Sequence, residues 1–531
     1  MSLLKNASTI GAMTMLSRIL GFVRDVLLAR VFGASPATDA FFVVFKIPNF
    51  FRRLFAEGAF QQAFVPVLSE YRETESRAAL KNYVDHMFGT LAAIVFVVVG
   101  IGIIAAPIVI MLFAPGFGRD GDQFDLATTM LWITFPYLFF ISLTAFAAST
   151  LNAFERFAMP ALAPIWLNIS LIAATLIAAP LFDEPVMALA WGVFIAGILQ
   201  LFFLLPFLAR LGLLPRPRLG RHRGVKKTIR LMLPAMFGAS VTQINLLIDT
   251  ILASLLVAGS VSWLYYSDRL VELPLGVLGV AIATVILPAM SRAFASQDEQ
   301  QYNQTLNGAL QLTILIGLPA MAGLVALAIP IITTLFEYSA FDGNDTTMVA
   351  WAMMFYAIGL PAFLLIKILA PGFFARQDTA TPVKIALIAI AANLVFKAIL
   401  LTPWLWLYDG YMAHVGLALT TALAAWVNAG LLALTLYRRA VWQPNRHVLR
   451  FIGQILLAAL AMAVVLLVIA PGHAQWQDWG GPMRFVSLMG FIATGTLLFV
   501  LFAAILGQTP RKLLRVVLFD KKPTQTSEAK S

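Results

Sequence analysis

Long apolar blocks, separated by short polar or Gly/Pro-containing stretches, follow one another along the whole chain. Two of them, 91–114 and 454–471, contain no charged side chain at all. Because a helix needs about 20 mostly apolar residues to cross the hydrocarbon layer, such blocks predict transmembrane α-helices. The pattern predicts an all-α polytopic membrane protein with about fourteen spans, at 8–33, 38–69, 84–113, 125–151, 160–180, 187–209, 228–257, 262–292, 304–335, 346–374, 382–402, 412–437, 448–470 and 484–507.

The two halves of the chain share their placement of prolines. Three pairs of similar segments align Pro66 with Pro288, Pro107 with Pro330 and Pro160 with Pro382, at a nearly constant spacing along the chain. A repeat unit of six helices keeps its orientation in the membrane, so the pattern predicts two parallel six-helix lobes around a central substrate site. We expect lobes at 1–225 and 226–440, two further helices at 441–510 and a basic tail at 511–531.

The composition excludes several classes of protein and site. Of the 531 residues, 60% are hydrophobic and only 12% are charged, and the mean hydropathy is +0.86. A soluble protein of this size needs more charge to cover its surface. The chain has no cysteine, and its five histidines are scattered without the spacing of metal ligands. Disulfides and cysteine-ligated metals are therefore excluded, and we expect no metal site.

The net charge of +11 lies mostly in the connecting segments. The loop 210–230 holds eight lysines and arginines and no acid, and further basic residues lie at 438–450 and after 510. Acidic residues occur instead in 181–186 and 337–345. The positive-inside rule then places both termini in the cytoplasm, in agreement with an even number of spans. The basic excess thus indicates topology, and we expect no nucleic-acid partner.

The first span carries a polar stripe. At about 100° per residue, Ser17, Arg18, Arg24 and Asp25 fall within an arc of about 120°, whereas Arg30 points away from it. A charge at the centre of a bilayer costs several kcal/mol. We therefore expect this stripe to face protein or water rather than lipid.

Two other spans repeat this theme. In the second span, Arg52 projects away from the polar face on an ideal helix, although Pro48 is expected to kink the helix. The polar face itself is formed by Asp39, Lys46, Arg53 and Glu57, and the eighth span adds Asp268, Arg269 and Glu272. In the second half of the chain, Asp249, Lys367 and Lys397 stand in otherwise apolar spans.

Two interpretations of these charges remain open. The acids Asp25, Asp39 and Glu57 are also explained by structural ion pairs between helices. The arginines outnumber the nearby acids, and a guanidinium stays charged and binds two phosphate oxygens at once. The group Arg18, Arg24, Arg52 and Arg269 therefore favours an anionic substrate, such as a phosphate or a diphosphate.

Three stretches resemble the MurJ (MviN) family of bacterial lipid II flippases, in the multidrug/oligosaccharidyl-lipid/polysaccharide exporter superfamily. They lie within 13–71 (including SRILGFVRDVLLARVFG), 259–288 (including YYSDRLVELPLGVLG) and 369–386 (LAPGFFARQDTATPVKIA). The resemblance runs essentially end to end and includes the two extra C-terminal helices. It implies two six-helix lobes around a cavity, with the last two spans forming a groove for a polyprenyl tail.

The resemblance also implies a substrate and a site. The substrate would be lipid II, an undecaprenyl diphosphate that carries a disaccharide pentapeptide, moved from the inner to the outer leaflet of the inner membrane as the lobes rock. The diphosphate would be bound by Arg18, Arg24, Arg52 and Arg269. The supporting cavity residues are Ser17, Asp25, Asp39, Lys46, Asn49, Arg53, Glu57 and Asp268, of which Arg53 and Asp268 come from the charge pattern alone.

Energy coupling is predicted to use the membrane potential. The sequence has no nucleotide-binding motif, so we expect no cofactor and no direct use of ATP. Some members of the family carry a sodium site in the C-terminal lobe, where this chain has Asp249, Asn393 and Lys397. A lysine there would place its own ammonium in a cation site, so we expect no sodium. Lipid II and the bilayer are the expected partners, and a contact with the cell-wall synthesis machinery stays open.

Rival functions fit the sequence less well. A drug/cation antiporter of the same superfamily prefers cations, and an O-antigen-type flippase lacks the two extra helices. A membrane enzyme, such as a lipid-linked glycosyltransferase or phosphatase, needs a metal-binding carboxylate pair or a catalytic histidine at a membrane face. The sequence shows no such cluster. We therefore predict a transporter rather than an enzyme, with a flippase for another anionic lipid-linked oligosaccharide as the alternative.

Overall fold

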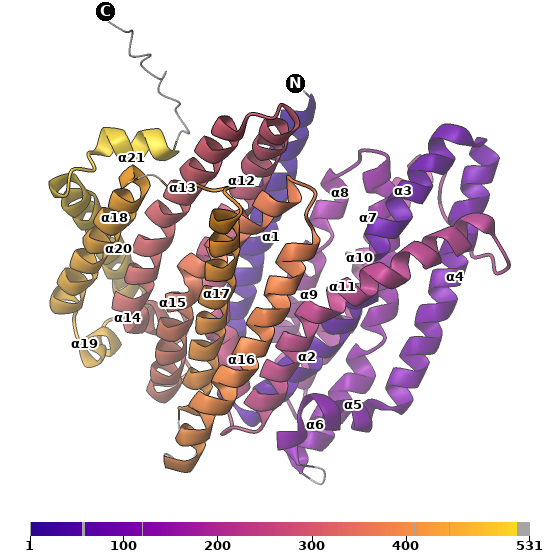
Figure 1. Cartoon of the computed structure of the whole chain (residues 1–531). Helices are drawn as coiled ribbons and strands as arrows, with labels where there is room; N and C mark the ends of the chain where they lie inside the picture. The colour runs from indigo at the N-terminus through magenta and orange to yellow at the C-terminus, as the bar shows by residue number, and fades with distance from the viewer. Residues whose placement is uncertain are drawn as a thin grey trace, which may run out of the picture. The chain divides into compact units, whose positions relative to one another are not determined.

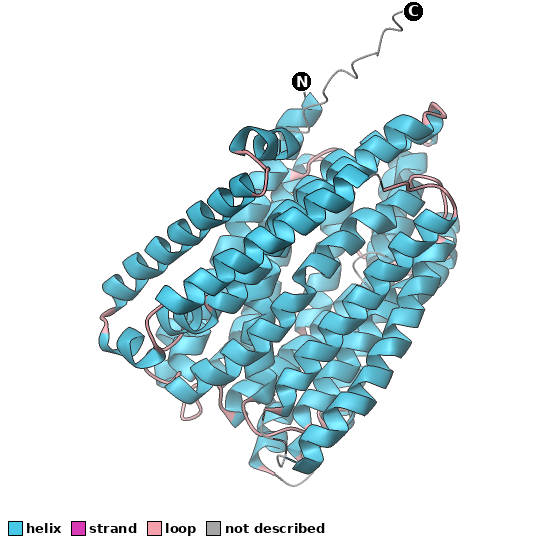
Figure 2. Ribbon diagram, turned by 60° about the vertical axis from the view of Figure 1, so that its left-hand side comes forward, coloured by secondary structure: helices cyan, strands magenta, loops and turns pink. Residues whose placement is uncertain are grey.

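The computed structural model describes residues 2–55, 59–118, 121–407, 410, 412–444 and 446–517. Within these residues the regular elements are all helices (Figure 2). Ten helices are long and apolar enough to cross a membrane, which confirms an all-α polytopic protein but does not confirm the count of fourteen. The four predicted spans outside these ten are 8–33, 38–69, 228–257 and 262–292, and each of them carries charged side chains.

The chain forms two compact units. Unit 1 comprises Met1–Tyr266 and Phe336–Asp345, and unit 2 comprises Ser267–Leu335 and Thr346–Ser531. The helices of unit 1 are α1 (Ser2–Phe32), α2 (Pro36–Phe55), α3 (Ala59–Thr74), α4 (Arg77–Ile104), α5 (Ala106–Phe113), α6 (Asp122–Thr134), α7 (Tyr137–Ala153), α8 (Ala158–Leu162), α9 (Ile165–Ala173), α10 (Met187–Arg210) and α11 (Arg223–Ser254).

The other helices belong largely to unit 2, with the first turns of α12 and α15 assigned to unit 1. They are α12 (Ser260–Ala295), α13 (Glu299–Ala326), α14 (Ala328–Leu335), α15 (Gly343–Phe374), α16 (Ala380–Leu407), α17 (Ala413–Arg438), α18 (Arg446–Ile469), α19 (His473–Asp478), α20 (Gly481–Ile505) and α21 (Pro510–Val517). The predicted lobes 1–225 and 226–440 were derived from the sequence repeat, whereas the two units are defined by the contacts within each of them. The lobe boundaries therefore stay a prediction.

Each unit is built from helices packed side by side. In unit 1, α7 lies between α4 and α10, and α11 runs along α2, α3 and α4 (Figure 1). In unit 2, α16 packs along α17, while α18 packs against both α13 and α20. Large apolar side chains on α4, α10, α18 and α20 are exposed, as expected for helices that face lipid.

The sequence repeat is visible in the helix boundaries. Helix α4 begins at Arg77 and α13 at Glu299, and both are 28 residues long. Helices α5 and α14 are both eight residues long and also begin at equivalent positions of the repeat. The turns that precede α4 and α13 are capped in the same way, because Ser76 accepts a hydrogen bond from the backbone N–H of Ala79 and Asp298 accepts one from Gln301.

The chain also leaves α7 and α15 through the same turn. Glu155 and Gln377 adopt left-handed φ angles of 59° and 61°. The next residue donates its backbone N–H to a carbonyl five residues earlier in both cases, from Arg156 to Leu151 and from Asp378 to Phe373. This is the hydrogen bond of a Schellman-type helix end. The two halves thus have the same backbone conformation and hydrogen bond at equivalent positions of the repeat.

Candidate functional site

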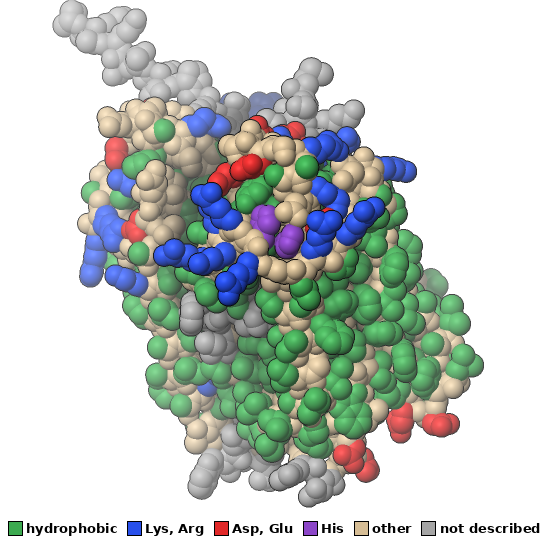
Figure 3. All heavy atoms as spheres, turned by 90° about the vertical axis from the view of Figure 1, so that its right-hand side faces the viewer, with side chains coloured by type: hydrophobic (Ala, Val, Ile, Leu, Met, Phe, Trp, Pro, Cys, Tyr) green, Lys and Arg blue, Asp and Glu red, His purple; other side chains and the backbone are tan. Residues whose placement is uncertain are grey.

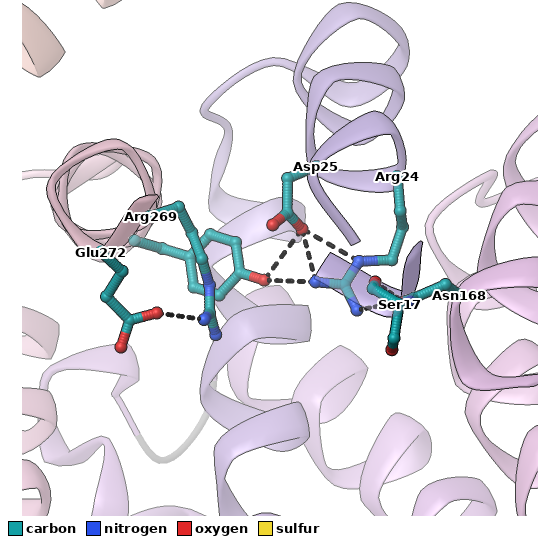
Figure 4. Close-up of polar contacts among 7 residues, drawn as sticks. Ser17, Arg24, Asp25, Asn168, Arg269 and Glu272 are labelled. Carbon is teal, nitrogen blue, oxygen red and sulfur yellow. Dashed lines mark hydrogen bonds and ion pairs between the residues drawn. The ribbon is translucent and has the colours of Figure 1, made fainter. Parts of the chain in front are cut away.

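A buried cluster of polar side chains centres on Arg24 of α1. Arg24 is only 7% exposed, and its Nε and Nη2 donate to Oδ1 of Asp25 over 2.9 and 2.7 Å (Figure 4). Its Nη1 donates to Oδ1 of Asn168 on α9 over 2.9 Å. The hydroxyl of Tyr265, at the start of α12, lies 3.2 Å from Nη2 of Arg24 and donates to Asp25 over 3.0 Å.

Helix packing fixes the partners of Arg24. Asn168 donates from Nδ2 to the backbone carbonyl of Ser17 over 2.9 Å. Gly21 lies directly beneath it, since a Cβ atom there would stand 3.6 Å from Nδ2 of Asn168. The ring of Tyr265 stacks on Phe42 of α2 with 3.9 Å between ring centroids. The cluster therefore joins α1, α2, α9 and the first turns of α12 within unit 1.

The sequence has more arginines than acids in these spans, which suggested that Arg24 lacks a negative partner. In the structure the carboxylate of Asp25 balances its charge. Breaking a buried ion pair leaves an uncompensated charge, and this makes the cluster a strong structural constraint on α1. The ion pair of Asp25 lies within α1, not between helices as predicted, and its link to α12 is the hydrogen bond that it accepts from Tyr265. Arg18 lies on the same helix and is exposed, while Ser17 is half-buried. Arg30 stacks on Tyr338, with its guanidinium carbon 4.0 Å from the ring centroid.

Helix α2 carries the second group of predicted residues. Asn49 donates to the backbone carbonyl of Phe45 over 2.7 Å and accepts from Nε of Arg52 over 3.2 Å. Arg52 is half-buried, whereas Arg53 is exposed. Arg52 thus has a partner one turn earlier on α2, and the choice between Arg52 and Arg53 as the substrate-binding residue stays a prediction. Lys46 is half-buried, and Glu57 lies outside the described residues.

Asp39 is a cap rather than an open cavity residue. Its carboxylate is buried and accepts hydrogen bonds from the backbone N–H of Gly259 over 2.7 Å and from the N–H and Oγ of Ser262 over 2.8 and 2.6 Å. These groups belong to the start of α12, where backbone N–H groups lack partners within the helix. A carboxylate placed there satisfies the donors and also meets the positive end of the helix dipole.

The eighth predicted span contributes to unit 2. Nη1 of Arg269 donates to Oε2 of Glu272, one turn further along α12, over 2.7 Å (Figure 4). Both side chains stay accessible, at 37% and 47% exposure, so this pair is weak compared with the Arg24 cluster. Asp268 is exposed next to it. The side chain of Arg269 is therefore partly accessible.

The predicted coupling residues lie on two helices. On α16, Asn393 and Lys397 are both buried and stand one turn apart on the same face. On α11, Asp249 is half-buried and lies 3.5 Å from Nδ2 of Asn245. Among the described residues, no group of three or more His, Cys, Asp or Glu side chains is placed to hold a metal ion. The role of these residues in coupling stays a prediction.

The structure adds functional candidates that the sequence analysis missed. Asn168 and Tyr265 complete the Arg24 cluster, and Nε1 of Trp263 donates to Oδ1 of Asp345 over 2.8 Å. Asn168 had a sequence signal, because it is a polar residue inside the apolar segment of α9. Tyr265 had none, since tyrosine is common in membrane proteins and only the packing of α12 against α1 and α2 shows its role.

Comparisons with known proteins agree with this architecture. A model of the family described as lipid II flippase MurJ matches residues 28–486. A probable lipid II flippase MurJ of Vibrio cholerae serotype O1 is 41% identical over 513 residues, which cover 95% of this chain and 96% of that protein. The lipid II flippase MurJ of Burkholderia cenocepacia is 42% identical over 506 residues, which cover 92% of this chain and 94% of that protein.

Solved structures show the same fold. A lipid II flippase MurJ in an inward closed conformation superposes with a TM-score of 0.78 at 28% identity, and the match covers 95% of this chain and 99% of that one. An inward-facing multidrug transporter of the MATE family matches with a TM-score of 0.64 at 14% identity, which is a likeness of fold alone. With the family model matched over most of the sequence and full-length relatives above 40% identity, the chain belongs to the MurJ family of lipid II flippases.

Proposed function

We propose that the protein translocates lipid II, or a closely similar lipid-linked precursor with a diphosphate, from the inner to the outer leaflet of the inner membrane. The observation that carries this proposal is the extent of the match, because relatives named as lipid II flippases are aligned over more than nine-tenths of both chains. The relatives and structures reported above are flippases or transporters, so they give no support to the membrane-enzyme alternative.

The arginines divide the work of binding the diphosphate. Arg18 is exposed and Arg52 and Arg269 are half-buried, so these side chains are more accessible than that of Arg24. Guanidinium groups replace the hydration of a diphosphate with charge-assisted, often bidentate hydrogen bonds. Arg24 is held by Asp25 and Asn168, and we assign it the role of fixing α1, which carries Arg18, against α9. Arg24 contacts substrate only if the phosphate replaces Asp25.

Movement of the head group requires alternate access from the two sides of the membrane. We propose that the two lobes rock, that the polyprenyl chain stays in lipid along α18 and α20, and that the membrane potential drives the cycle. Moving one elementary charge through 100 mV is worth about 2.3 kcal/mol, enough to bias such a cycle. Both termini lie in the cytoplasm in this proposal, because the basic loops then obey the positive-inside rule.

The second candidate function is transport of another anionic lipid-linked oligosaccharide of the same superfamily. It keeps the arginines and the tail groove, since these recognise the diphosphate and the lipid rather than the sugars. The two functions differ in the substrate that appears in the outer leaflet, so the test must detect lipid II itself.

The test is a depletion-and-rescue experiment. The flippase of a bacterial host is depleted, this chain is expressed, and lipid II in the outer leaflet is measured. We expect rescue by the unchanged chain and loss of rescue in Arg18→Ala and Arg269→Ala. The matched control is Arg438→Ala, an exposed arginine at the end of α17 that is assigned neither to the diphosphate nor to the lipid tail, and it should rescue fully. Failure of the stable, inserted wild-type chain to restore lipid II would favour the second candidate function.

A further inference from the structure

The segment 213–223, which we call the basic strap, connects α10 to α11 and is held firmly on α4. The backbone N–H of Arg216 donates to Oδ1 of the buried Asp85 over 2.8 Å, and the N–H of Arg218 donates to the backbone carbonyl of the same aspartate over 3.2 Å. Asp85 also pairs with Lys81 of α4. The strap therefore has a fixed register on the helix, although it contains no regular secondary structure before α11.

A glycine allows the strap to approach this closely. A Cβ atom on Gly89 would lie 2.3 Å from the carbonyl oxygen of Arg218. Real side chains do not tolerate such a distance, so any larger residue at this position must push the strap away from α4. The backbone of the strap and the backbone of the helix are thus in direct contact.

Further contacts hold both ends of the strap. At its start, Nη2 of Arg77 donates to the backbone carbonyl of Leu211 over 2.7 Å. At its end, the rings of His86 and His222 stack with centroids 5.1 Å apart, and Nδ1 of His222 accepts from the backbone N–H of Gly224 over 3.1 Å. Burial and the neighbouring His86 lower the pKa of His222, which keeps this acceptor nitrogen unprotonated at neutral pH.

The strap presents basic and apolar side chains outward. Arg216, Arg218, Arg221 and Arg223 are all exposed, and Arg218 also donates to Oδ1 of Asn82 over 3.3 Å. Two exposed leucines accompany the arginines: Leu214, before Arg216, is 45% exposed, and Leu219, between Arg218 and Arg221, is 73% exposed. Figure 3 shows lysine and arginine side chains gathered around two histidines, above a broad hydrophobic surface.

The strap lies at the depth of lipid head groups. The exposed apolar surface of α4 begins at Ile94 and continues through α5, and 94–113 is about 30 Å of helix, the thickness of the hydrocarbon layer. Asp85 and Gly89, where the strap is attached, lie five to nine residues before Ile94. That is about 7–14 Å of helix beyond the hydrocarbon boundary, where phosphates and glycerol groups lie.

We propose that the basic strap is a preformed binding surface for the phosphodiester head groups of anionic phospholipids. Its arginines bind the phosphate oxygens, and Leu214 and Leu219 insert into the boundary between head groups and acyl chains. Exposed apolar side chains that stand beside basic ones gain free energy when they enter a membrane interface. The proposal does not rest on the transport of lipid II, because the strap contains none of the residues assigned to the substrate.

Preorganisation separates this proposal from a simple excess of positive charge. A basic residue close to a bound anionic lipid contributes about 1 kcal/mol, or about fivefold in affinity, whether or not the backbone that carries it is ordered. A built surface loses affinity when its backbone is displaced, even if every charge remains. Gly89→Ala tests this difference, since it pushes the strap from α4 and leaves the net charge unchanged.

The experiment measures the association of labelled phosphatidylglycerol with the purified full chain in mixed neutral micelles. The double variant Arg218→Gln/Arg221→Gln should lower the association constant about 30-fold. Gly89→Ala and Asp85→Ala should lower it toward that level, although Asp85→Ala makes the protein more positive. The control Arg446→Gln/Arg450→Gln, two exposed arginines on α18, should leave the association constant close to that of the wild type.

Thermal unfolding of each variant shows whether the fold is kept. If Gly89→Ala does not fold, Asp85→Asn, which keeps the size of the side chain and weakens the attachment of the strap, takes its place. Equal binding by the wild type and Gly89→Ala, or tighter binding by Asp85→Ala, would overturn the proposal in favour of unspecific charge. Inorganic phosphate at matched concentration should not displace the lipid. Displacement by phosphate alone would show a site for free phosphate, and equal binding of phosphatidylcholine would show no head-group selectivity; either result would contradict the proposal.

Discussion

Helices α1 and α11 occupy matching positions of the repeat, and they differ in the residues that matter most. Arg24 and Asp25 on α1 correspond to Leu246 and Leu247 on α11. Asn168, which holds Arg24, corresponds in the same way to Ile390. The backbones of the two halves agree in helix length, caps and turns, whereas the polar cluster exists only in the first half of the described chain.

A second difference between the halves concerns a cation–π contact, in which the arginine and the phenylalanine have exchanged positions. The guanidinium of Arg72 lies 5.3 Å from the ring centroid of Phe154, and that of Arg376 lies 5.3 Å from the ring of Phe294. Positions 72 and 154 correspond to 294 and 376, so the cation and the ring have changed places between the halves. Both halves keep the cation–π contact but exchange the positions of the arginine and the phenylalanine. The energy of the contact does not depend on which helix supplies the charge.

The two differences together show what constrains each part of the repeat. Backbone geometry is constrained by hydrogen bonding inside a membrane protein, where an unsatisfied group costs several kcal/mol. A charged cluster among apolar helices is also costly, and it persists only where its charges are matched or used. The first half therefore carries a feature that the fold alone does not require.

The largest expected effect comes from giving α1 the residues of α11. Asp25→Leu leaves Arg24 buried without its carboxylate and should cost roughly 3–5 kcal/mol of stability. The double variant Arg24→Leu/Asp25→Leu should recover most of this loss, because no buried charge remains, while rescue of lipid II transport stays absent. Chemical unfolding in detergent and the rescue assay measure the two quantities. A double variant that transports normally would contradict the assigned role, because transport would then not need the cluster to fix α1.

Replacing Asn168 by the residue of the second half should have an intermediate effect. Asn168→Ile removes the acceptor of Arg24 and the donor to the carbonyl of Ser17, which should cost roughly 1–3 kcal/mol. The same unfolding measurement checks it. Combined with Arg24→Leu/Asp25→Leu, the cost of Asn168→Ile should shrink, since the partner of its oxygen is then missing. Strict additivity would contradict the proposed network.

The helix caps should behave alike in both halves. Ser76→Ala before α4 and Asp298→Ala before α13 each remove the side chain that accepts a backbone N–H of the first turn. Each should cost about 1 kcal/mol. Thermal unfolding of the two single variants, measured side by side, tests the equivalence of the caps. A much larger loss in only one of them would mean that its cap has a tertiary role that the repeat does not share.

The smallest effect is a pH dependence limited to the second half. Two hydrogen bonds from Thr381 and one from Arg439 lower the pKa of Asp378 to about 2, and the matching residue in the first half is Arg156. A carboxyl with a lowered pKa stabilises the folded state above its unfolded value of 3.8, and it loses this contribution as the pH falls toward 2. The midpoint difference between wild type and Asp378→Asn should thus be constant from pH 7 to pH 5.

Below pH 4 the same difference should shrink, and it should vanish near pH 2. Arg156→Gln is the matched control in the first half, and its midpoint difference from the wild type should not change over this range, because an arginine does not titrate there. A midpoint difference for Asp378→Asn that grows on acidification would contradict the assigned hydrogen bonds.

Much of the fold followed from the sequence. Eight of the ten apolar spans were predicted to within a few residues at both ends, because hydrocarbon thickness sets the length of a helix and hydropathy marks it. The predictions 84–113 and 304–335 were wrong at their ends, because the apolar sequence continues past the ends of α4 and α13 into the separate helices α5 and α14. The repeat was predicted from three pairs of prolines, and the helix boundaries of α4, α5, α13 and α14 follow the same spacing. The four charged spans, 8–33, 38–69, 228–257 and 262–292, are not among these ten helices. Their charged side chains lower the mean hydropathy of the span.

The site was predicted less completely. The polar stripe of α1 and the resemblance to the family identified Arg24, Asp25 and Arg52 as important positions. They did not show that Arg24 is paired, that Asp39 caps α12, or that Asn168 and Tyr265 take part. Helical projection gives the direction of a side chain on its own helix, but a pair requires knowing which helices are neighbours. Nor did it show the hydrogen bond that Nε of Arg52 donates to Asn49.

The sequence by itself determined a polytopic helical membrane protein, its internal repeat, its family and the set of charges that the membrane must accommodate. These follow from local properties, namely hydropathy, spacing and residue type. Only the tertiary structure decided which charges are matched inside a unit and which stay accessible, because pairing depends on contacts such as that between positions 24 and 168, far apart in the chain. The path of the basic strap along α4 also depends on tertiary contacts, those of the buried Asp85 and of Gly89.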